Sequence, residues 1–306
     1  MTTFRPAEPT GRQVALRSSD GRITAQIAQV GASLRALTVD GVALVPPYPA
    51  GSTTPGASGI VLVPWPNRIR DGKWTQRGET RQLPVTELST NTATHGLLRF
   101  RDYLVTESAD GTEATLASTV FPQTGYPFHL DTTVTYRLTD RGIDVEHVLT
   151  NVGADDAPVA LGTHPYLCFD AVDTADLVLR VPGDTYDILD ERLLPVEEVP
   201  VDAATDLRSG ARLGDIDVNR AYGRLSRDAE GTARTTLTAP DGRSVTLWQG
   251  AGFDYVQVYT TDRYPGRPLA VAVEPMTAPA DAFNSGTGLT WLQPGESWSL
   301  RWGITT

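Results

Sequence analysis

The sequence has few of the residues on which several protein classes depend. It contains 1 cysteine, Cys168, and 4 histidines in 306 residues. One cysteine excludes an internal disulfide framework and any zinc or iron–sulfur centre that uses several cysteine ligands. No two histidines lie four residues apart beside a glutamate, and the sequence has no Walker A or dinucleotide-binding glycine loop. We therefore expect no bound metal and no cofactor, and we expect Cys168 to be a small buried apolar residue.

Positive charge is also scarce. The 26 Lys and Arg residues stand against 37 Asp and Glu residues, which gives a formal net charge of −11. Because nucleic-acid-binding proteins present clustered positive charge, neither nucleic acid nor an anionic membrane surface is an expected partner. The longest apolar runs, Ile60–Val63 and Leu269–Val273, are far shorter than the ~18 residues of a membrane-spanning helix. The polar N-terminal segment carries no secretory signal, which predicts a cytoplasmic protein.

Glycine and proline, by contrast, are abundant, with 28 and 22 residues, and they separate short segments in which apolar and polar residues alternate. One pair of such segments, Leu130–Leu138 and Ile143–Leu149, flanks an Asp-Arg-Gly turn and is typical of a β-hairpin. A second hairpin is predicted around Pro240–Arg243, and alternation returns in Trp298–Ile304. No longer segment has a convincing helical periodicity. The sequence therefore predicts an almost all-β protein.

A single all-β domain can hold a chain of this length. The segment Pro46–Gly59 has the composition of a linker, but the residues before it are too few to form a core of their own. We therefore expect one domain over residues 1–306, a large antiparallel β-sandwich whose long loops carry the functional site. The sequence leaves open whether the protein is a monomer or a homodimer.

Two of the predicted strands end in an ionisable residue. Glu274 ends Leu269–Glu274, His164 ends Val159–His164, and a proline follows each. Since proline donates no ladder hydrogen bond, each strand is expected to stop there, with its ionisable side chain at the rim of a sheet. Each ionisable residue also shares its sheet face with two very small side chains: Ala270 and Ala272 beside Glu274, and Ala160 and Gly162 beside His164. This pattern predicts either open volume for a small ligand or room for a bulky neighbour from another layer.

Two further segments carry side chains that suit a ligand. One contains Trp65, which lies between two prolines and gives a rigid aromatic surface, and Arg68, whose five fixed donors suit sugar hydroxyls or carboxylates. The alternative for Arg68 is a solvated position in a surface loop. The other segment contains Gly96, which would allow close backbone approach, and His95, which could reach a ligand. A lone loop histidine is, however, more often structural.

Four segments together resemble, in order and rough spacing, the signature blocks of the aldose 1-epimerases (galactose mutarotase-like proteins): PWPNRIRDGKW, ATHGLLRF, LGTHPYLCF and VAVEPMTAPADAFN. The likeness runs from about Val61 to Gly295 and is most specific in the His-Pro-Tyr and Glu-Pro-Met-Thr blocks. The chain is most similar to a bacterial branch with Pro-Trp-Pro-Asn-Arg-Ile, some members of which are associated with sulfoquinovose catabolism. The resemblance implies a β-sandwich of the supersandwich type, no metal, and interconversion of the α and β anomers of free aldoses.

The resemblance also implies how the reaction is divided among side chains. Glu274 would be the general base and His164 the general acid, while Arg68 and His95 would hold sugar hydroxyls. The residue types suit the chemistry, because opening a hemiacetal ring removes a proton from the C1 hydroxyl and delivers one to the ring oxygen. Neither a covalent intermediate nor a redox cofactor is required.

The chain departs from the family pattern at one position. The family usually has an Asp that accepts sugar hydroxyls three residues before an aromatic residue, and Asn219 occupies this place here. Asp217 lies two residues earlier and could substitute for it. Trp65 and Tyr166 are candidates for packing on the C–H faces of the sugar, with ordinary sheet core as the alternative.

Three alternative functions remain open at this point. A sugar-binding sandwich without catalysis would have no need of the acid–base pair. A mutarotase for an anionic hexose, such as a 6-phosphate or sulfoquinovose, would need extra cationic residues at the site, for which Arg70, Arg99 and Arg101 are available. A glycoside hydrolase would typically use two carboxylates, and no second motif carboxylate matches Glu274.

Overall fold

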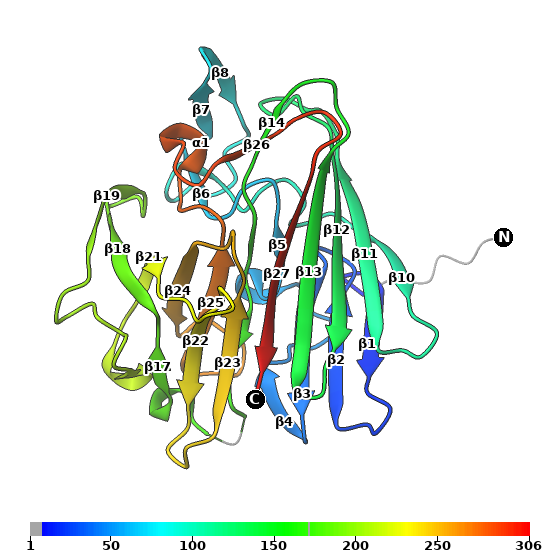
Figure 1. Ribbon diagram of the computed structural model, residues 1–306, viewed down its shortest axis with the longest axis vertical. Helices are drawn as coiled ribbons and strands as arrows, with labels where there is room; N and C mark the ends of the chain where they lie inside the picture. The colour runs from blue at the N-terminus through cyan, green and yellow to red at the C-terminus, as the bar shows by residue number, and fades with distance from the viewer. Residues whose placement is uncertain (1–7, 171) are drawn as a thin grey trace.

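The computed structural model describes residues 8–170 and 172–306, and almost every regular element in them is a β-strand (Figure 1). The strands form antiparallel sheets of nine, eight and four strands and three two-stranded pairs. This confirms the predicted antiparallel all-β fold class.

The nine-stranded sheet crosses the molecule from β10 on the right of Figure 1 to β17 on the left. Its strands, in spatial order, are β10 (Leu104–Glu107), β11 (Glu113–Val120), β12 (Leu130–Leu138), β13 (Gly142–Asn151), β27 (Ser297–Thr305), β23 (Ser244–Gln249), β22 (Ala233–Thr238), β17 (Val178–Arg180) and β20 (Ala211–Arg212). The four-stranded sheet consists of β1 (Gln13–Arg17), β2 (Ile23–Ala28), β3 (Ser33–Val39) and β4 (Val42–Val45), and it contacts the nine-stranded sheet through β1, β2 and β3.

The eight-stranded sheet carries most of the residues that matter for function. Its strands, in spatial order, are β19 (Pro195–Pro200), β18 (Gly183–Leu189), β21 (Asn219–Leu225), β24 (Tyr255–Thr261), β25 (Ala270–Met276), β15 (Gly162–Thr163) and β5 (Val61–Leu62), and β16 (Tyr166–Leu167) also pairs with β25.

Small elements cover the ends of the sheets. The strand pairs are β6 (Arg68–Arg70) with β9 (Thr92–Thr94), β7 (Lys73–Gln76) with β8 (Glu79–Gln82), and β14 (Ala157–Val159) with β26 (Thr290–Leu292). The helical elements are α1 (Ala282–Ser285) and the 3₁₀ turns η1 (Pro55–Ala57), η2 (Thr174–Asp176) and η3 (Leu213–Asp215). Within the described residues, no helix has the length and apolar character needed to cross a membrane.

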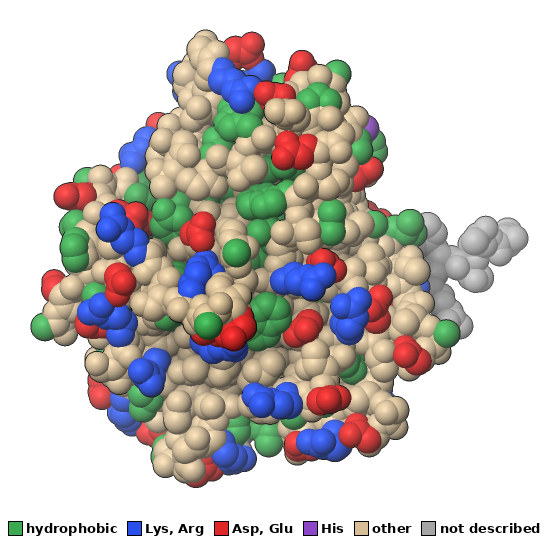
Figure 2. Space-filling model, viewed as in Figure 1, with side chains coloured by type: hydrophobic (Ala, Val, Ile, Leu, Met, Phe, Trp, Pro, Cys, Tyr) green, Lys and Arg blue, Asp and Glu red, His purple; other side chains and the backbone are tan. Residues whose placement is uncertain are grey.

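Both hairpins expected from the sequence are present. In β12–β13, Leu138 lies opposite Ile143 across the predicted turn, and in β22–β23, Thr238 lies opposite Ser244. Their buried apolar residues belong to one core cluster that extends from Val14 in β1 to Ile304 in β27. Figure 2 shows charged side chains of both signs interspersed over the visible face.

The two faces of β25 have different surroundings, as its alternating sequence predicts. Val271 and Val273 belong to the main core. The opposite face packs in a separate cluster of buried residues: Ala270 and Ala272 with Tyr166 and Tyr264. The small alanines therefore admit bulky aromatic rings, which was the second of the two interpretations. Gly162 likewise faces a neighbour rather than open space, because a Cβ there would lie 2.7 Å from Cβ of Pro66.

Two predicted strand boundaries are wrong. Residues 159–164 do not form one strand, because β14 and β15 pair in different sheets and the chain between them is irregular. On the other side, β25 does not stop at Glu274 but continues through Pro275 to Met276. The amides of Val273 and Thr277 donate to the carbonyls of Pro165 and Leu161. Pro275 lies between these two donors, opposite the break between β15 and β16, where no ladder donor is needed.

Candidate active site

A cavity of about 760 Å³ opens above the eight-stranded sheet, on the face opposite the main core. Its floor is formed by Glu274 of β25, Gln257 and Tyr259 of β24, and Asn219 at the start of β21. Segments from elsewhere in the chain form the walls, and the residues that they contribute include Arg68, Glu87, His95, His164 and Asp217. The volume and the mixture of polar groups suit a small-molecule ligand.

A carboxyl and a histidine touch each other in this cavity. Nε2 of His164 lies 3.3 Å from Oε1 of Glu274, and the two residues are only 5% and 2% exposed. The break between β15 and β16 places His164 there, and backbone bonds fix it: His164 N donates to Ile60, and the His164 carbonyl accepts from Gly59.

Burial determines the protonation of this pair. It raises the pKa of Glu274 to about 8 and lowers the pKa of His164 to about 4, because each charged form loses its hydration. At neutral pH burial therefore favours one proton on the pair, held by Glu274 beside a neutral His164 at a separation of 3.3 Å. The same proton count describes an ionised Glu274 beside a protonated His164, so a ligand can shift the pair between these forms without exchanging a proton with solvent.

Two aromatic rings hold the imidazole of His164 in place. The ring of Tyr166 stacks on it at 5.5 Å and the ring of His95 meets it edge-on at 5.4 Å. His95 is itself fixed by a left-handed backbone (φ 61°) and by its amide, which donates to the Asn67 carbonyl. Burial, followed by the proximity of His164, holds the pKa of His95 well below its ordinary value. His95 is therefore neutral and can both donate and accept hydrogen bonds.

Glu87 orients Arg68 at the cavity wall. Nε and one terminal nitrogen of Arg68 donate to the two carboxylate oxygens of Glu87 at 2.7 and 3.0 Å. Glu87 also accepts the hydroxyls of Thr90 and Thr92 at 2.8 and 3.1 Å. The remaining donors of Arg68 thus keep a fixed direction, since a bidentate pair fixes the plane of the guanidinium.

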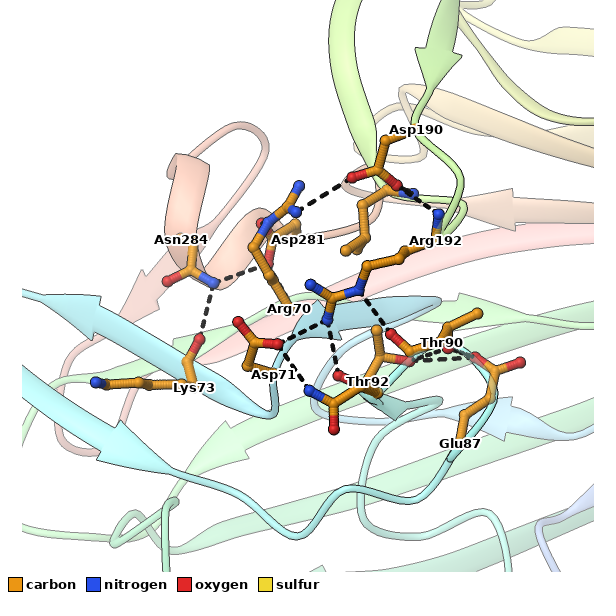
Figure 3. Close-up of polar contacts among 12 residues, drawn as sticks. Arg70, Asp71, Lys73, Glu87, Thr90, Thr92, Asp190, Arg192, Asp281 and Asn284 are labelled. Carbon is orange, nitrogen blue, oxygen red and sulfur yellow. Dashed lines mark hydrogen bonds and ion pairs between the residues drawn. The ribbon is translucent and has the colours of Figure 1, made fainter.

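An outer set of polar contacts, shown in Figure 3, ties this wall to the β18–β19 hairpin. Arg192 of the hairpin donates to the Thr90 carbonyl at 2.8 Å and to the Asp71 carboxylate at 2.7 Å. Arg70 of β6 donates to Asp190 of the same hairpin at 3.2 Å. Because these contacts join segments that are distant in sequence, they hold the loop that carries Glu87 against the rest of the site.

A row of side-chain amides crosses the cavity floor. Asn67 accepts from Arg68 at 3.1 Å and donates to Gln257 at 3.4 Å. Gln257 in turn donates to Oδ1 of Asn219 at 2.9 Å. Asp217, just before β21, accepts the Thr260 hydroxyl at 3.0 Å. The cavity therefore offers several donors and acceptors in fixed positions.

Comparison with known proteins identifies the family. Residues 13–305 match the model of the aldose 1-epimerase family. The chain belongs to that family. It is 33% identical, over 298 residues, to the protein YihR of Escherichia coli K12, which is described as uncharacterized. The alignment covers 96% of this chain and 93% of that relative. The resemblance stated from the signature blocks is thereby confirmed.

Solved structures share the epimerase fold. The galactose 1-epimerase of Lactobacillus acidophilus NCFM has a TM-score of 0.77 at 20% identity, over 94% of this chain and 92% of that one. The GalM/aldose epimerase homologue from C. elegans has a TM-score of 0.81 at 20% identity, over 96% and 98% of the two chains. At this identity the likeness establishes the galactose mutarotase-like sandwich.

Most of the residues that the epimerase motifs pick out come together in the cavity: Glu274, His164, Arg68, His95, Asn219 and Asp217 all line it. Gly96 permits the approach expected of it, since a Cβ there would lie 2.1 Å from the Val63 carbonyl oxygen. Cys168 is buried, as predicted, and burial raises the pKa of its thiol to about 12.

Trp65 and Tyr166 lie outside the cavity lining. Trp65 packs edge-on against Phe283 at 5.5 Å in the main core, and Tyr166 lies behind His164. Tyr166 packs with Ala270 and Ala272 on the face of β25 opposite the main core, whereas Trp65 belongs to the main core itself. The structure therefore places them as supports of the site rather than as its surface.

The cationic candidates for an anionic sugar also lie elsewhere. Arg70 pairs with Asp190 and Asp281, Arg99 lies over the ring of Phe100, and neither these two nor Arg101 lines the cavity. The arginine that lines the cavity together with Arg68 is Arg263, from the loop after β24.

Sequence reasoning missed several polar or aromatic lining residues, among them Asn67, Glu87, Gln257 and Tyr259. Asn67 stands within the Pro-Trp-Pro-Asn-Arg block, so its motif could have indicated it. Gln257 and Tyr259 alternate on β24, but only the pairing of β24 between β21 and β25 shows that their face is the cavity floor.

The donor set of the site differs from that of a metal centre. Among residues 8–170 and 172–306, no group of three or more His, Cys, Asp and Glu side chains is arranged to hold a metal ion.

Proposed function

We propose that this protein is an aldose 1-epimerase that interconverts the α and β anomers of a free hexose. The observation that carries the proposal is the direct contact between a buried carboxyl and a buried histidine, 3.3 Å apart, in a cavity of about 760 Å³. Membership of the aldose 1-epimerase family supports it.

In the proposed reaction, Glu274 accepts the proton of the C1 hydroxyl while His164 donates a proton to the ring oxygen. This step starts from ionised Glu274 and protonated His164, the form that sugar hydroxyls favour by donating to the carboxylate. The C1–ring oxygen bond breaks, the open-chain aldehyde rotates about C1–C2, and the ring closes with the two roles exchanged. The proton count of the pair is unchanged over a cycle. Each positioned group contributes ~10²–10⁴-fold.

The other lining residues hold the sugar in this proposal. Arg68, oriented by Glu87, and neutral His95 bind hydroxyls near the reacting centre. Asn219 and Asp217 take hydroxyls at the β21 side of the cavity. Tyr259 supplies an aromatic surface on the floor. Since Asn219 offers an amide where the family usually has a carboxylate, it can donate as well as accept hydrogen bonds.

The charges of the lining favour a neutral hexose as the first candidate. Arg68 is already paired with Glu87, and Asp217 and Asp262 also line the cavity. An anionic hexose is the second candidate, and Arg263 favours it. Arg263 lines the cavity and forms no ion pair with any residue of the described parts of the chain.

Mutarotation measured by polarimetry tests the proposal. Freshly dissolved glucose, galactose, a hexose 6-phosphate and a hexose 6-sulfonate are compared with and without enzyme, and at least one should equilibrate faster than its spontaneous rate. A protein that binds sugar but leaves every spontaneous rate unchanged would be the non-catalytic alternative. If only the anionic sugars respond, and Arg263→Gln removes that response, the second candidate is correct.

A further inference from the structure

A buried carboxyl next to the sugar cavity takes no part in the proposed reaction. Asp187 of β18 is 6% exposed, and its Oδ2 has no hydrogen-bond partner within residues 8–170 and 172–306. Asp187 lines a second, small cavity of about 10 Å³ that it shares with Asn67, Arg68, Asn219 and Gln257. These four residues also line the sugar cavity. A space of this size is about that of one water molecule.

Strand register explains why the small cavity exists. Gln257 lies opposite Glu274 on one side and opposite Ala221 on the other. Tyr186 of β18 lies opposite Tyr222 of β21, so the next residue along β18, Asp187, falls in the same cross-strand row as Ala221. Only a methyl group stands between Gln257 and Asp187, and this leaves the space.

The amide row on the cavity floor has a direction. It begins at Arg68, which can only donate and whose terminal nitrogen bonds to Oδ1 of Asn67. The NH₂ group of Asn67 donates to Oε1 of Gln257, and the NH₂ group of Gln257 donates to Oδ1 of Asn219. The NH₂ group of Asn219 is therefore left at the end of the row as a donor. Asp187, whose Oδ2 is an acceptor without a partner in the described residues, lines the same small cavity as Asn219.

We propose that Asp187 is a positioning residue of the sugar site, which accepts the NH₂ group of Asn219 through one water molecule in the small cavity. Arg68 and Asp187 then fix the two ends of the row, so that Asn67, Gln257 and Asn219 each present a defined oxygen or NH₂ group to the sugar. Without the acceptor at the far end, the Asn219 amide can turn over and exchange its donor for its acceptor. The role of Asp187 rests on the proposed function of the cavity.

The surroundings of Asp187 support this role. Burial, followed by the charge of Glu198 on β19, raises the pKa of Asp187 to about 7. The other titratable groups that face it are Tyr255 of β24 and Arg68 of β6. A carboxyl that is buried opposite another carboxylate destabilises the fold, which is expected of a group kept for function rather than for packing.

Three variants test the proposal by the KM and kcat of mutarotation. Asp187→Leu removes the acceptor, and we expect KM to rise about 10-fold with little change in kcat, the effect of losing one hydrogen bond to bound sugar. Asp187→Asn keeps an acceptor oxygen but cannot ionise, so its KM should stay near that of wild type. The match should be best below the Asp187 pKa of about 7, where the wild-type carboxyl is neutral like the amide, and the two KM values should depart modestly above that pH. Asp184→Asn is the control, because Asp184 lies on the same strand, is exposed and pairs with Arg208.

A second readout does not depend on activity. The side-chain NH₂ resonances of Asn219, assigned by their loss in Asn219→Asp, should shift with a midpoint near pH 7 in the wild type and Asp184→Asn but not in Asp187→Asn. An unchanged KM in Asp187→Leu, with or without a lower melting temperature, would overturn the proposal, and so would Asn219 resonances that ignore Asp187. If the wild type has no mutarotase activity, the proposed function fails while the resonance test still decides whether Asp187 contacts the amide row.

Discussion

Replacing Glu274 with glutamine separates a catalytic role from a structural one. Glutamine keeps the size of the side chain, and its amide can take the place of the carboxyl that lies 3.3 Å from Nε2 of His164. It cannot accept the proton of the C1 hydroxyl. We therefore expect Glu274→Gln to bind sugar nearly as well as wild type while turnover falls ~10²–10⁴-fold, a loss of ~3–5 kcal/mol in transition-state stabilisation.

Whereas Glu274→Gln should lower turnover, it should raise the free energy of unfolding at neutral and higher pH. Glu274 is 2% exposed, and burial raises its pKa from 4.5 to about 8. The unfolded chain therefore releases this proton first, and between these two pH values the contribution of the Glu274 carboxyl to native stability falls by about 1.4 kcal/mol per pH unit. Over the whole interval the loss is roughly 5 kcal/mol. Since glutamine does not ionise, Glu274→Gln should be more stable than wild type at pH 8, and this advantage should vanish at pH 4.5.

The assay measures the melting temperature, sugar affinity and turnover of both proteins on the same preparations at several pH values. The combination of raised stability at pH 8, retained affinity and lost turnover identifies Glu274 as a base that is kept at a cost to the fold. A folded variant with normal turnover would refute the reasoning, because the reaction would then have its base elsewhere. Lower stability with normal turnover per folded molecule would assign Glu274 to a structural contact.

Three further predictions concern other groups. His164→Asn should lower turnover at least ~10²-fold, the usual contribution of a general acid, and a folded variant with near wild-type turnover would contradict that role. Exhaustive chelation should leave mutarotation unchanged, because side chains supply both proton transfers; a loss restored by a divalent ion would refute this. Burial lowers the pKa of His147 to about 3, so the free energy of unfolding should fall by ~1.4 kcal/mol per pH unit below the unfolded pKa of ~6.5. Chemical denaturation of His147→Gln, which keeps an acceptor for the indole N–H of Trp302, should show a flatter pH dependence there, and an unchanged slope would contradict the assignment.

The sequence by itself determined the features that depend on neighbours along the chain. Alternation predicts the β12–β13 hairpin and the two faces of β25, because the side-chain period of a strand is a local property. The order of four short motifs indicates the family, and with it the residues that line the cavity, since each motif carries its residue types and spacing wherever the fold places them.

The tertiary structure decided what lies opposite each of these residues. The motifs place Trp65 and Tyr166 next to candidate site residues, but only packing shows that Phe283 and Tyr264 contact them. Likewise, Pro275 continues a strand because the break at His164 faces it. The amide row and the buried Asp187 arise from pairing among β18, β21, β24 and β25. Strand pairing brings together residues that are far apart in sequence, and no local pattern specifies which strand becomes the neighbour of which.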